Sequence, residues 1–333
     1  MQAILAVTVP FFALVLLGWL AARAGPLPES AIPGLNAYVL FFALPCMLFR
    51  LGSSLPLARL IDPALIAIYL LCAVLVVALT VAITWRRVRA GGVDLRDAAF
   101  GALVAAFPNA GFMGVPLLVA LFGDAAAGPV IGAILVDLIV TSTLCLALAQ
   151  AASHRATRDA GAEHHALHAA LLSLRGALAN PLPWAIVLGA TFALGGLALP
   201  GPLAQIVRML GDSATPVALF TIGAVLFRAG QHAHTRTPIA RYLPVALVKL
   251  VVHPALVFGA CLAMRGLGAS VSPFGLMVLT LTAALPSASN AAILAERYGA
   301  DNGRIARIIM ASTVLAFVTF SAIAWAFEHA RSA

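Results

Sequence analysis

The sequence predicts an all-α polytopic membrane protein with ten transmembrane helices in two inverted five-helix repeats. The first observation is composition: of 333 residues, 62% are hydrophobic and only 10% are charged, which no soluble domain matches. The second is a polar linker at 152–180, which leaves five apolar segments on either side. The third is that the fourth segment of each half is interrupted by residues that disfavour a helix.

The first repeat, 1–151, holds five segments long enough to cross a bilayer, and the second repeat, 181–333, holds five more. The predicted spans of the first repeat are 3–22, 31–51, 63–85, 97–122 and 129–151. Those of the second are 181–199, 203–227, 239–264, 273–297 and 303–327. Because each repeat has an odd number of spans, the second enters the membrane in the opposite sense, as inverted repeats of transporters do.

Most arginines fall in the loops after the odd-numbered spans. Basic loops stay in the cytoplasm, so the linker 152–180 is predicted to be cytoplasmic and both termini to face outward. The formal net charge of +8 therefore reflects membrane orientation, and no nucleic-acid partner is expected. The expected location is the plasma (inner) membrane, with the lipid bilayer as the surrounding partner.

The stretch 107–116 interrupts the fourth span. Pro108 lacks a backbone N–H, Asn109, Gly111 and Gly114 are poor helix formers, and Pro116 follows. Freed backbone groups in hydrocarbon cost several kcal/mol, so a broken helix persists only where protein buries it or a polar cavity hydrates it. We expect a discontinuous helix around a polar site; a simple proline kink is the alternative.

A second interruption lies at 284–290 in the ninth span and contains Pro286, Ser287, Ser289 and Asn290. Entering from opposite sides of a core about 30 Å thick, both interruptions reach mid-depth, so the two broken helices are predicted to cross there. Interrupted spans at corresponding positions of two halves indicate a transporter binding site.

Each interruption creates a helix N-terminus inside the membrane, and helix N-termini bind anions without a buried cation. We expect Asn109 to cap the first new helix and Ser287 or Ser289 the second. The amides of Asn109 and Asn290 either contact the substrate or only complete the broken backbone. The predicted substrate-binding residues are Pro108, Asn109, Gly111, Gly114, Pro286, Ser287, Ser289 and Asn290.

Asp137 in the fifth predicted span, and Lys249 and His253 in the eighth, are ionisable residues placed well inside the membrane. Such residues are functional candidates, so we expect them to couple transport to a proton or another cation. Asp137 and Lys249 could pair directly. In the alternative, Thr141 holds Asp137 and Lys249 extends toward the cytoplasm.

The linker carries His154, His164, His165 and His168, of which His164 and His168 would share one face of a helix. No glutamate or cysteine pair stands where a zinc site would need it, so we expect a solvated connector and no metal. No cofactor is expected either. The chain has no Gly-rich phosphate-binding motif ending in Lys-Ser/Thr, which argues against pumping driven by ATP.

Three stretches together resemble the auxin efflux carrier family. They are 36–45 in the second span, 108–116 in the fourth, and 286–290 with Tyr298 and Gly299 in the ninth. The stretch from Lys249 to Pro254 is similar to the eighth span of that family. The family contains plant auxin exporters and many bacterial permeases for malate, malonate and similar acids. The short linker resembles the bacterial members, so auxin itself is not the expected substrate.

The resemblance implies that helices 1, 2, 6 and 7 form a scaffold, often a homodimer, and that helices 3–5 and 8–10 form a transport domain. It implies that a substrate anion binds beside the crossing and that the transport domain moves as an elevator. Bile-acid/sodium symporters share this architecture, so coupling to sodium stays open.

We therefore expect a secondary transporter of small organic anions, mono- or dicarboxylates such as malate or malonate. The alternatives are a sodium/proton-coupled cation exchanger that uses Asp137 and Lys249, and a sodium symporter of the bile-acid type. An enzyme is not expected, because Asp137 is a lone carboxylate and acid–base catalysis needs paired groups. A sensor is not expected either, since no soluble signalling domain is present.

Overall fold

The computed structural model describes residues 2–56, 60–86, 91–157, 179–231, 237–289 and 291–332. These residues form helices joined by short connections, with isolated β-bridges between Trp85 and Val93 and between Pro108 and Ser287. Within this described part, seven helical stretches are long and apolar enough to cross a membrane, and three shorter apolar helices accompany them. The expected all-helical, multi-pass membrane protein is confirmed.

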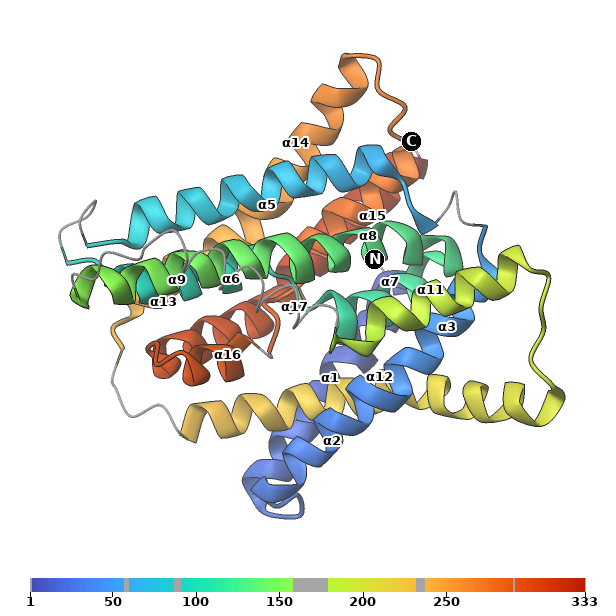
Figure 1. Ribbon diagram of the computed structural model, residues 1–333, viewed down its shortest axis with the longest axis horizontal. Coiled ribbons are helices and arrows are strands. Elements are labelled where there is room, and N and C mark those ends of the chain that lie inside the picture. The colour runs from blue at the N-terminus through green and yellow to red at the C-terminus, as the bar shows by residue number, and fades with distance from the viewer. Residues whose placement is uncertain are drawn as a thin grey trace.

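One group of helices occupies the lower and right part of Figure 1. It consists of α1 (Gln2–Ala24), η1 (Glu29–Ala31), α2 (Ile32–Tyr38), η2 (Val39–Ala43), α3 (Leu44–Ser54), α11 (Pro181–Leu194) and α12 (Gly201–Gln231). α2 continues through the π-helical turn η2 into α3, so that these three elements make one span. α1 packs along α12, and α3 packs along α11 and also crosses α12.

Glycines make these crossings close. A Cβ atom placed at Gly18 of α1 would overlap the carbonyl oxygen of Phe220, and one at Gly223 of α12 would overlap that of Val15. The same holds between α3 and α11, at Gly52 and Gly189. Small residues that let backbones approach are the usual means of helix association in membranes, where the hydrophobic effect gives no preference for helix over lipid.

The second group fills the upper and left part of Figure 1 and the centre. From the first half it contains α5 (Pro63–Thr84), α6 (Leu95–Ala106), η3 (Ala110–Gly114), α7 (Val115–Phe122), η4 (Asp124–Ala126), α8 (Ala127–Val136), η5 (Asp137–Thr141) and α9 (Ser142–Thr157). From the second half it contains α13 (Ile239–Leu247), η6 (Val248–Val252), α14 (His253–Gly266), α15 (Pro273–Ala283), α16 (Ala291–Arg297) and α17 (Asn302–Ser332).

Several helix starts follow directly from the sequence. Asp62, Asp94 and Ser272 accept hydrogen bonds from backbone N–H groups in the first turns of α5, α6 and α15, and Asn180 does so for α11. Each side chain satisfies a donor that the first helical turn leaves without a partner.

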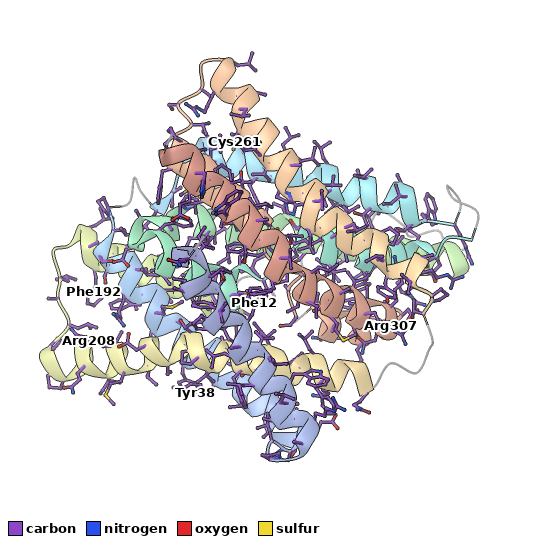
Figure 2. The ribbon with its side chains drawn as sticks, turned by 180° about the vertical axis from the view of Figure 1, so that it is seen from behind. Phe12, Tyr38, Phe192, Arg208, Cys261 and Arg307 are labelled. Carbon is purple, nitrogen blue, oxygen red and sulfur yellow. The ribbon has the colours of Figure 1, made fainter. Side chains whose placement is uncertain are left out.

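The two groups touch along α1 and α17, where the rings of Phe12 and Phe317 meet edge to face with centroids 5.2 Å apart. Figure 2 views the molecule from behind and labels Phe12 near the middle of this contact. η3 also packs against α12, so the interrupted region 107–114 lies where the two groups face each other.

Candidate functional site

The helical path stops at Ala106, the end of α6, and resumes at Ala110, the start of η3. Asn109 has φ −76° and ψ 54°, and the Ala110 N–H donates to the Pro108 carbonyl at 2.7 Å. These values describe an inverse γ-turn, which redirects the chain in three residues. After the turn, the Asn109 carbonyl accepts from Met113 and Gly114 and so opens the π-helical turn η3.

A second gap between helices lies after Ala283, the end of α15, and before Ala291, the start of α16. The two interruptions form an antiparallel bridge. The Asn109 N–H donates to the Pro286 carbonyl at 2.8 Å, and the Ala288 N–H donates to the Phe107 carbonyl at 3.0 Å. Pro108 and Ser287 face each other between these bonds, at a position where the ladder needs no N–H, so a proline fits there.

Ser287 compensates for the amide that Pro108 lacks. In an unbroken helix the Val104 carbonyl would accept from residue 108, which as proline has no N–H. The Ser287 hydroxyl donates to that carbonyl instead, at 2.6 Å. The Ser287 N–H donates in turn to the Ser312 hydroxyl of α17 at 3.2 Å, and Ser312 donates to Ile309. The two interruptions thus complete each other's backbone hydrogen bonding.

Lys249 performs the equivalent role at the end of α15. Since the Ser287 N–H bonds to Ser312, the Ala283 carbonyl has lost its helical donor, and Lys249 Nζ donates to it at 2.9 Å. A cation at a helix C-terminus is also favoured by the helix dipole. Lys249 is fully buried and its Nζ lies at the Ala283 carbonyl, which argues against the alternative that it extends toward the cytoplasm.

His253 lies one turn beyond Lys249 and is also fully buried. Its Nδ1 is 3.1 Å from Lys249 Nζ, and its ring is tilted against that of Tyr69 with centroids 5.6 Å apart. No described residue forms a hydrogen bond with its Nε2. Tyr69, on α5, donates its hydroxyl proton to Asp137 Oδ2 at 2.9 Å. Tyr69 and His253 therefore stand between the buried carboxylate and the buried amine.

Asp137 begins the π-helical turn η5 and is fully buried. Besides Tyr69, Thr141 donates to its other carboxylate oxygen at 2.9 Å. The contact between Thr141 and Asp137 that the alternative expected is therefore present. No ion pair joins Asp137 to Lys249 among the described residues, so the suggested direct pairing is absent.

Asn109 is 4% exposed, and its side chain does not cap the helix that follows, so the predicted capping role is wrong. The reason is the γ-turn, in which the backbone of Asn109 supplies the contacts instead. Its amide is left available beside the bridge. Ser287 is not a cap either, because its hydroxyl is committed to Val104. Ser289 is 8% exposed, and Asn290 lies outside the described residues.

The two glycines of the motif have different surroundings. A Cβ at Gly114 would lie 2.6 Å from Leu285 Cδ1, so this glycine lets the ninth span approach. A Cβ at Gly111 would meet only Leu182 of α11, at an ordinary 3.7 Å. Gly111 therefore borders the other group of helices without filling the space between them.

Two residues of this network were not predicted, Tyr69 and Ser312. A tyrosine inside an apolar span was a usable signal for the first. Ser312 had no distinguishing local signal, since helical serines commonly bond to their own backbone. The linker residues His164, His165 and His168 lie outside the described residues.

Comparison with known proteins identifies the family of this chain. The family described as membrane transport proteins matches residues 3–324, nearly the whole chain. The chain belongs to this family. It includes auxin efflux carriers, so the resemblance seen in the sequence is confirmed. Membership indicates a transporter rather than an enzyme.

Relatives are similar over most of their length. A protein of Rhizobium meliloti (strain 1021) named "Putative malonate transporter" is 28% identical over 328 residues, which covers 97% of this chain and 95% of the relative. An uncharacterized transporter of Methanothermobacter thermautotrophicus is 29% identical, covering 92% of each chain. Auxin efflux carrier component 8 of Arabidopsis thaliana is 24% identical, covering 89% of each.

Proposed function

We propose that this protein is a secondary transporter that moves small organic anions, mono- or dicarboxylates such as malate or malonate, across the membrane by an elevator-type mechanism. The observation that carries the proposal is the meeting of two interrupted spans in one bridge, next to the Asn109 amide. Interrupted helices around a polar site at the junction of two halves are typical of secondary transporters. The R. meliloti relative, whose name refers to malonate, supports the substrate class.

The proposed architecture has ten spans in two inverted repeats with crossing broken helices 4 and 9. Three pairs of residues support an equivalence of the halves. The two residues of each pair are 171 positions apart: Gly18 and Gly189, Pro45 and Pro216, and Gly52 and Gly223. The glycines of these pairs are the ones that bring α1 onto α12 and α11 onto α3, which are corresponding contacts in an inverted repeat.

In this proposal α1, α2–α3, α11 and α12 form a static scaffold, which associates as a homodimer, and the second group of helices forms the moving domain. The bridge favours movement of that domain as one body. Opening the site by separating the two interrupted spans would expose the hydrogen bonds of Asn109, Ala288 and Ser287. In a membrane each unsatisfied group costs several kcal/mol, so a rigid shift of the whole site is the cheaper route.

The crossing offers donors suited to a carboxylate. The Asn109 amide is buried and is not used as a helix cap, and Asn290 is adjacent in sequence to the second interruption. Amide donors in a site of low dielectric bind anions without a permanent counter-charge. Lys249 adds a positive charge at the neighbouring end of α15.

Asp137, Lys249 and His253 are proposed to couple transport to a proton or sodium ion. A chain of contacts runs from Asp137 through Tyr69 and His253 to Lys249, and Lys249 holds the interrupted end of α15. A change of protonation anywhere along this chain would alter the support of the crossing. A cation exchanger is the second candidate, because a fully buried carboxylate such as Asp137 is also a cation ligand.

In the proposed orientation both termini face outward and the linker 152–180 is cytoplasmic, in the plasma (inner) membrane. The excess of arginine in the odd-numbered loops supports this direction. Arg228 at the end of α12 pairs with Glu29 at 3.1 Å, so these two loop-proximal residues lie on one side of the bundle.

The proposal is tested by ligand-induced thermal stabilisation of the purified protein. Malonate, malate, lactate, a bile acid and an indole acid are each added with and without sodium. We expect stabilisation by a small mono- or dicarboxylate, and a sodium requirement would identify the coupling ion. The Asn109→Ala variant should keep its melting temperature without ligand, since the side chain caps no helix, and should lose the response.

If no acid stabilises the wild-type protein but sodium or a change of pH alone does, the cation exchanger replaces this proposal. A full acid response in Asn109→Ala would remove the crossing from the binding site. Gly259→Ala is the matched control, because a Cβ there meets open space on α14, far from the crossing.

A further inference from the structure

A second charged centre lies at the end of the bundle where α5, α13 and α17 meet. Its core is Arg304, on the first turn of α17, with a side chain 1% exposed. Nε donates to the Arg241 carbonyl at 2.9 Å and Nη1 to the Asp97 carbonyl at 2.9 Å. Gly101 makes room for this guanidinium, since a Cβ there would lie 3.0 Å from Nη1.

The charge of Arg304 is not neutralised by contact. A guanidinium has five N–H donors, and the bonds above use two. Among the described residues no carboxylate forms an ion pair with it. The nearby Asp97 carboxylate accepts from the Asp301 N–H at 2.8 Å, and Asp301 caps α17 through the Arg304 N–H at 3.0 Å. Asp97 and Asp301 lie near the guanidinium without forming an ion pair with it, so its remaining N–H groups can bind an anion that enters the cavity.

A cavity of about 250 Å³ lies against this side chain. Its walls come from the end of α5 and the following loop, from the start of α13, and from Arg304; the polar lining includes Thr84, the backbone of Gly91 and Gly92, and Arg241. Two arginines therefore line the cavity, Arg304 buried and Arg241 exposed, and none of its described lining residues carries a carboxylate.

We propose that this cavity is a binding site for a phosphate group, held between Arg304 and Arg241. Arginine is suited to the ligand because its planar fork donates two parallel hydrogen bonds to phosphate oxygens. The volume holds a phosphate with a small attached group. This site is separate from the crossing of the interrupted spans and does not depend on the function proposed for it.

The depth of the cavity indicates the source of the phosphate. Thr84 ends the span Pro63–Thr84, Arg241 is in the first turn of the span Ile239–Gly266, and Arg304 is in the first turn of the span Asn302–Ala330. Three span ends meet at the level of lipid headgroups. Basic pockets between helices at this level bind anionic headgroups, so the phosphate of an anionic lipid is the expected occupant, and a free phosphate anion is the other source.

The test measures thermal stabilisation of the full chain in a neutral detergent. Three probes are titrated: potassium phosphate at constant ionic strength, short-chain phosphatidylglycerol, and short-chain phosphatidylcholine. We expect phosphatidylglycerol to stabilise wild type at lower concentration than phosphatidylcholine. In Arg241→Gln the apparent affinity should fall about tenfold, because one charge-assisted pair is lost. A response to inorganic phosphate equal to that of phosphatidylglycerol would identify the free anion as the ligand.

Two controls separate binding from general electrostatics. Arg297→Gln removes an exposed arginine at the end of α16 that does not line the cavity, and should leave the titrations unchanged. Ala240→Glu places a carboxylate at the cavity wall and should abolish the response, whereas Ile239→Glu on the same helical turn, which does not line it, should not. Equal titrations for wild type and Arg241→Gln, or equal losses in both members of either control pair, would overturn the proposal.

Discussion

At the scale of single residues, Ser287 connects the two halves of the chain most directly. Its hydroxyl occupies the Val104 carbonyl that Pro108 leaves without a donor, and its amide is bound by Ser312. A proline that interrupts a membrane helix is tolerated only if other groups satisfy the freed backbone. Here that group comes from a segment 183 residues away in the sequence.

Replacing Ser287 by alanine should therefore destabilise the fold. The Val104 carbonyl would remain buried without a donor, which costs about 1–3 kcal/mol. Unfolding of the purified protein by heat or by a denaturing detergent measures the loss. Ser54→Ala is the control, because Ser54 is exposed and its hydroxyl donates to Leu51 of its own helix, so its removal should change stability little. Equal stability of Ser287→Ala and wild type would mean that the hydroxyl is not needed for the crossing.

Asp137→Asn tests the coupling role. Both carboxylate oxygens of Asp137 accept hydrogen bonds, one from Tyr69 and one from Thr141. In the asparagine variant an NH₂ group would replace one of these oxygens and would face a hydroxyl that also donates. If Asp137 takes up the coupled proton, uptake into vesicles by wild type should fall as the pH on the uptake side rises, and uptake by Asp137→Asn should be independent of pH. Tyr69→Phe removes one of the bonds and keeps the carboxylate, so it should retain pH dependence. A pH profile unchanged in Asp137→Asn would make the residue structural.

At the scale of helices, the close crossing of α1 and α12 depends on Gly18 and Gly223. A methyl group at Gly223 would overlap the Val15 carbonyl, so Gly223→Ala must push the helices apart and should cost about 1–3 kcal/mol. The equivalent change at Gly259, where a methyl meets open space, should be neutral or slightly stabilising because alanine favours a helix. Thermal unfolding of both variants checks this, and equal melting temperatures would contradict the described packing.

The interruptions were predictable from the sequence because proline, glycine and asparagine act locally. The sequence located both stretches, and the helices end within a few residues of the expected positions. The bond from Ser287 to Val104 and that from Lys249 to Ala283 were not predictable. Each depends on the register between segments far apart in the chain, which no local pattern encodes. The predicted cap at Asn109 failed for the related reason that its backbone conformation is set by the partner strand.

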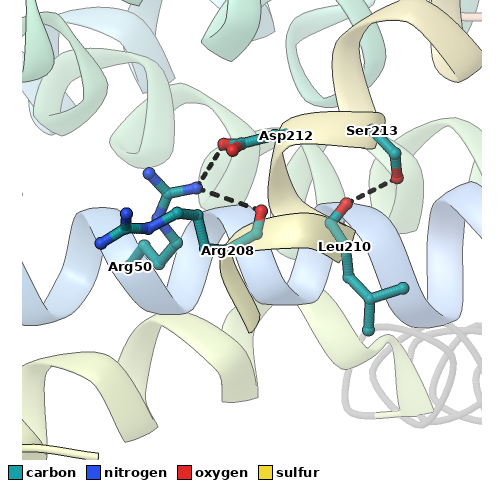
Figure 3. A network of polar contacts seen from close by, with 5 residues as sticks. All are labelled: Arg50, Arg208, Leu210, Asp212 and Ser213. Carbon is teal, nitrogen blue, oxygen red and sulfur yellow. Dashed lines mark hydrogen bonds and ion pairs between the residues drawn. The ribbon is translucent and has the colours of Figure 1, made fainter. Parts of the chain in front are cut away.

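The positions of the apolar helices can be predicted from the hydrophobicity of the sequence, but the lengths of the helices cannot. α11 and α15 are shorter than the stretch of about 20 residues that a straight crossing needs, and α12 extends for 31 residues. Figure 3 shows why α12 tolerates polar residues: Arg50 of α3 pairs with Asp212 and also donates to the Arg208 carbonyl, and Ser213 bonds within the helix to Leu210. Such pairs form only after the helices meet, so hydropathy alone misplaces the boundary.

At the scale of the whole molecule, the orientation can be measured with single cysteines in a background without the four native ones. Leu197 and Leu267 are 59% and 82% exposed and lie on loops predicted to face outward. Cysteines there should react with an impermeant thiol reagent added to intact cells. Glu296→Cys, on the exposed end of α16, should react only after permeabilisation. The reverse pattern would invert the orientation and place the linker outside.

The bridge between the interruptions also has a consequence for biogenesis. When the first half of the chain leaves the ribosome, the Phe107 and Val104 carbonyls and the Asn109 amide have no partners, because these lie at 286–288. The stretch 104–109 cannot complete its hydrogen bonds until residues 286–288 are made, so until then it needs a hydrated or protein-lined site. Separate polypeptides of residues 1–151 and 181–333 should accordingly accumulate only when they are produced together in the same cell.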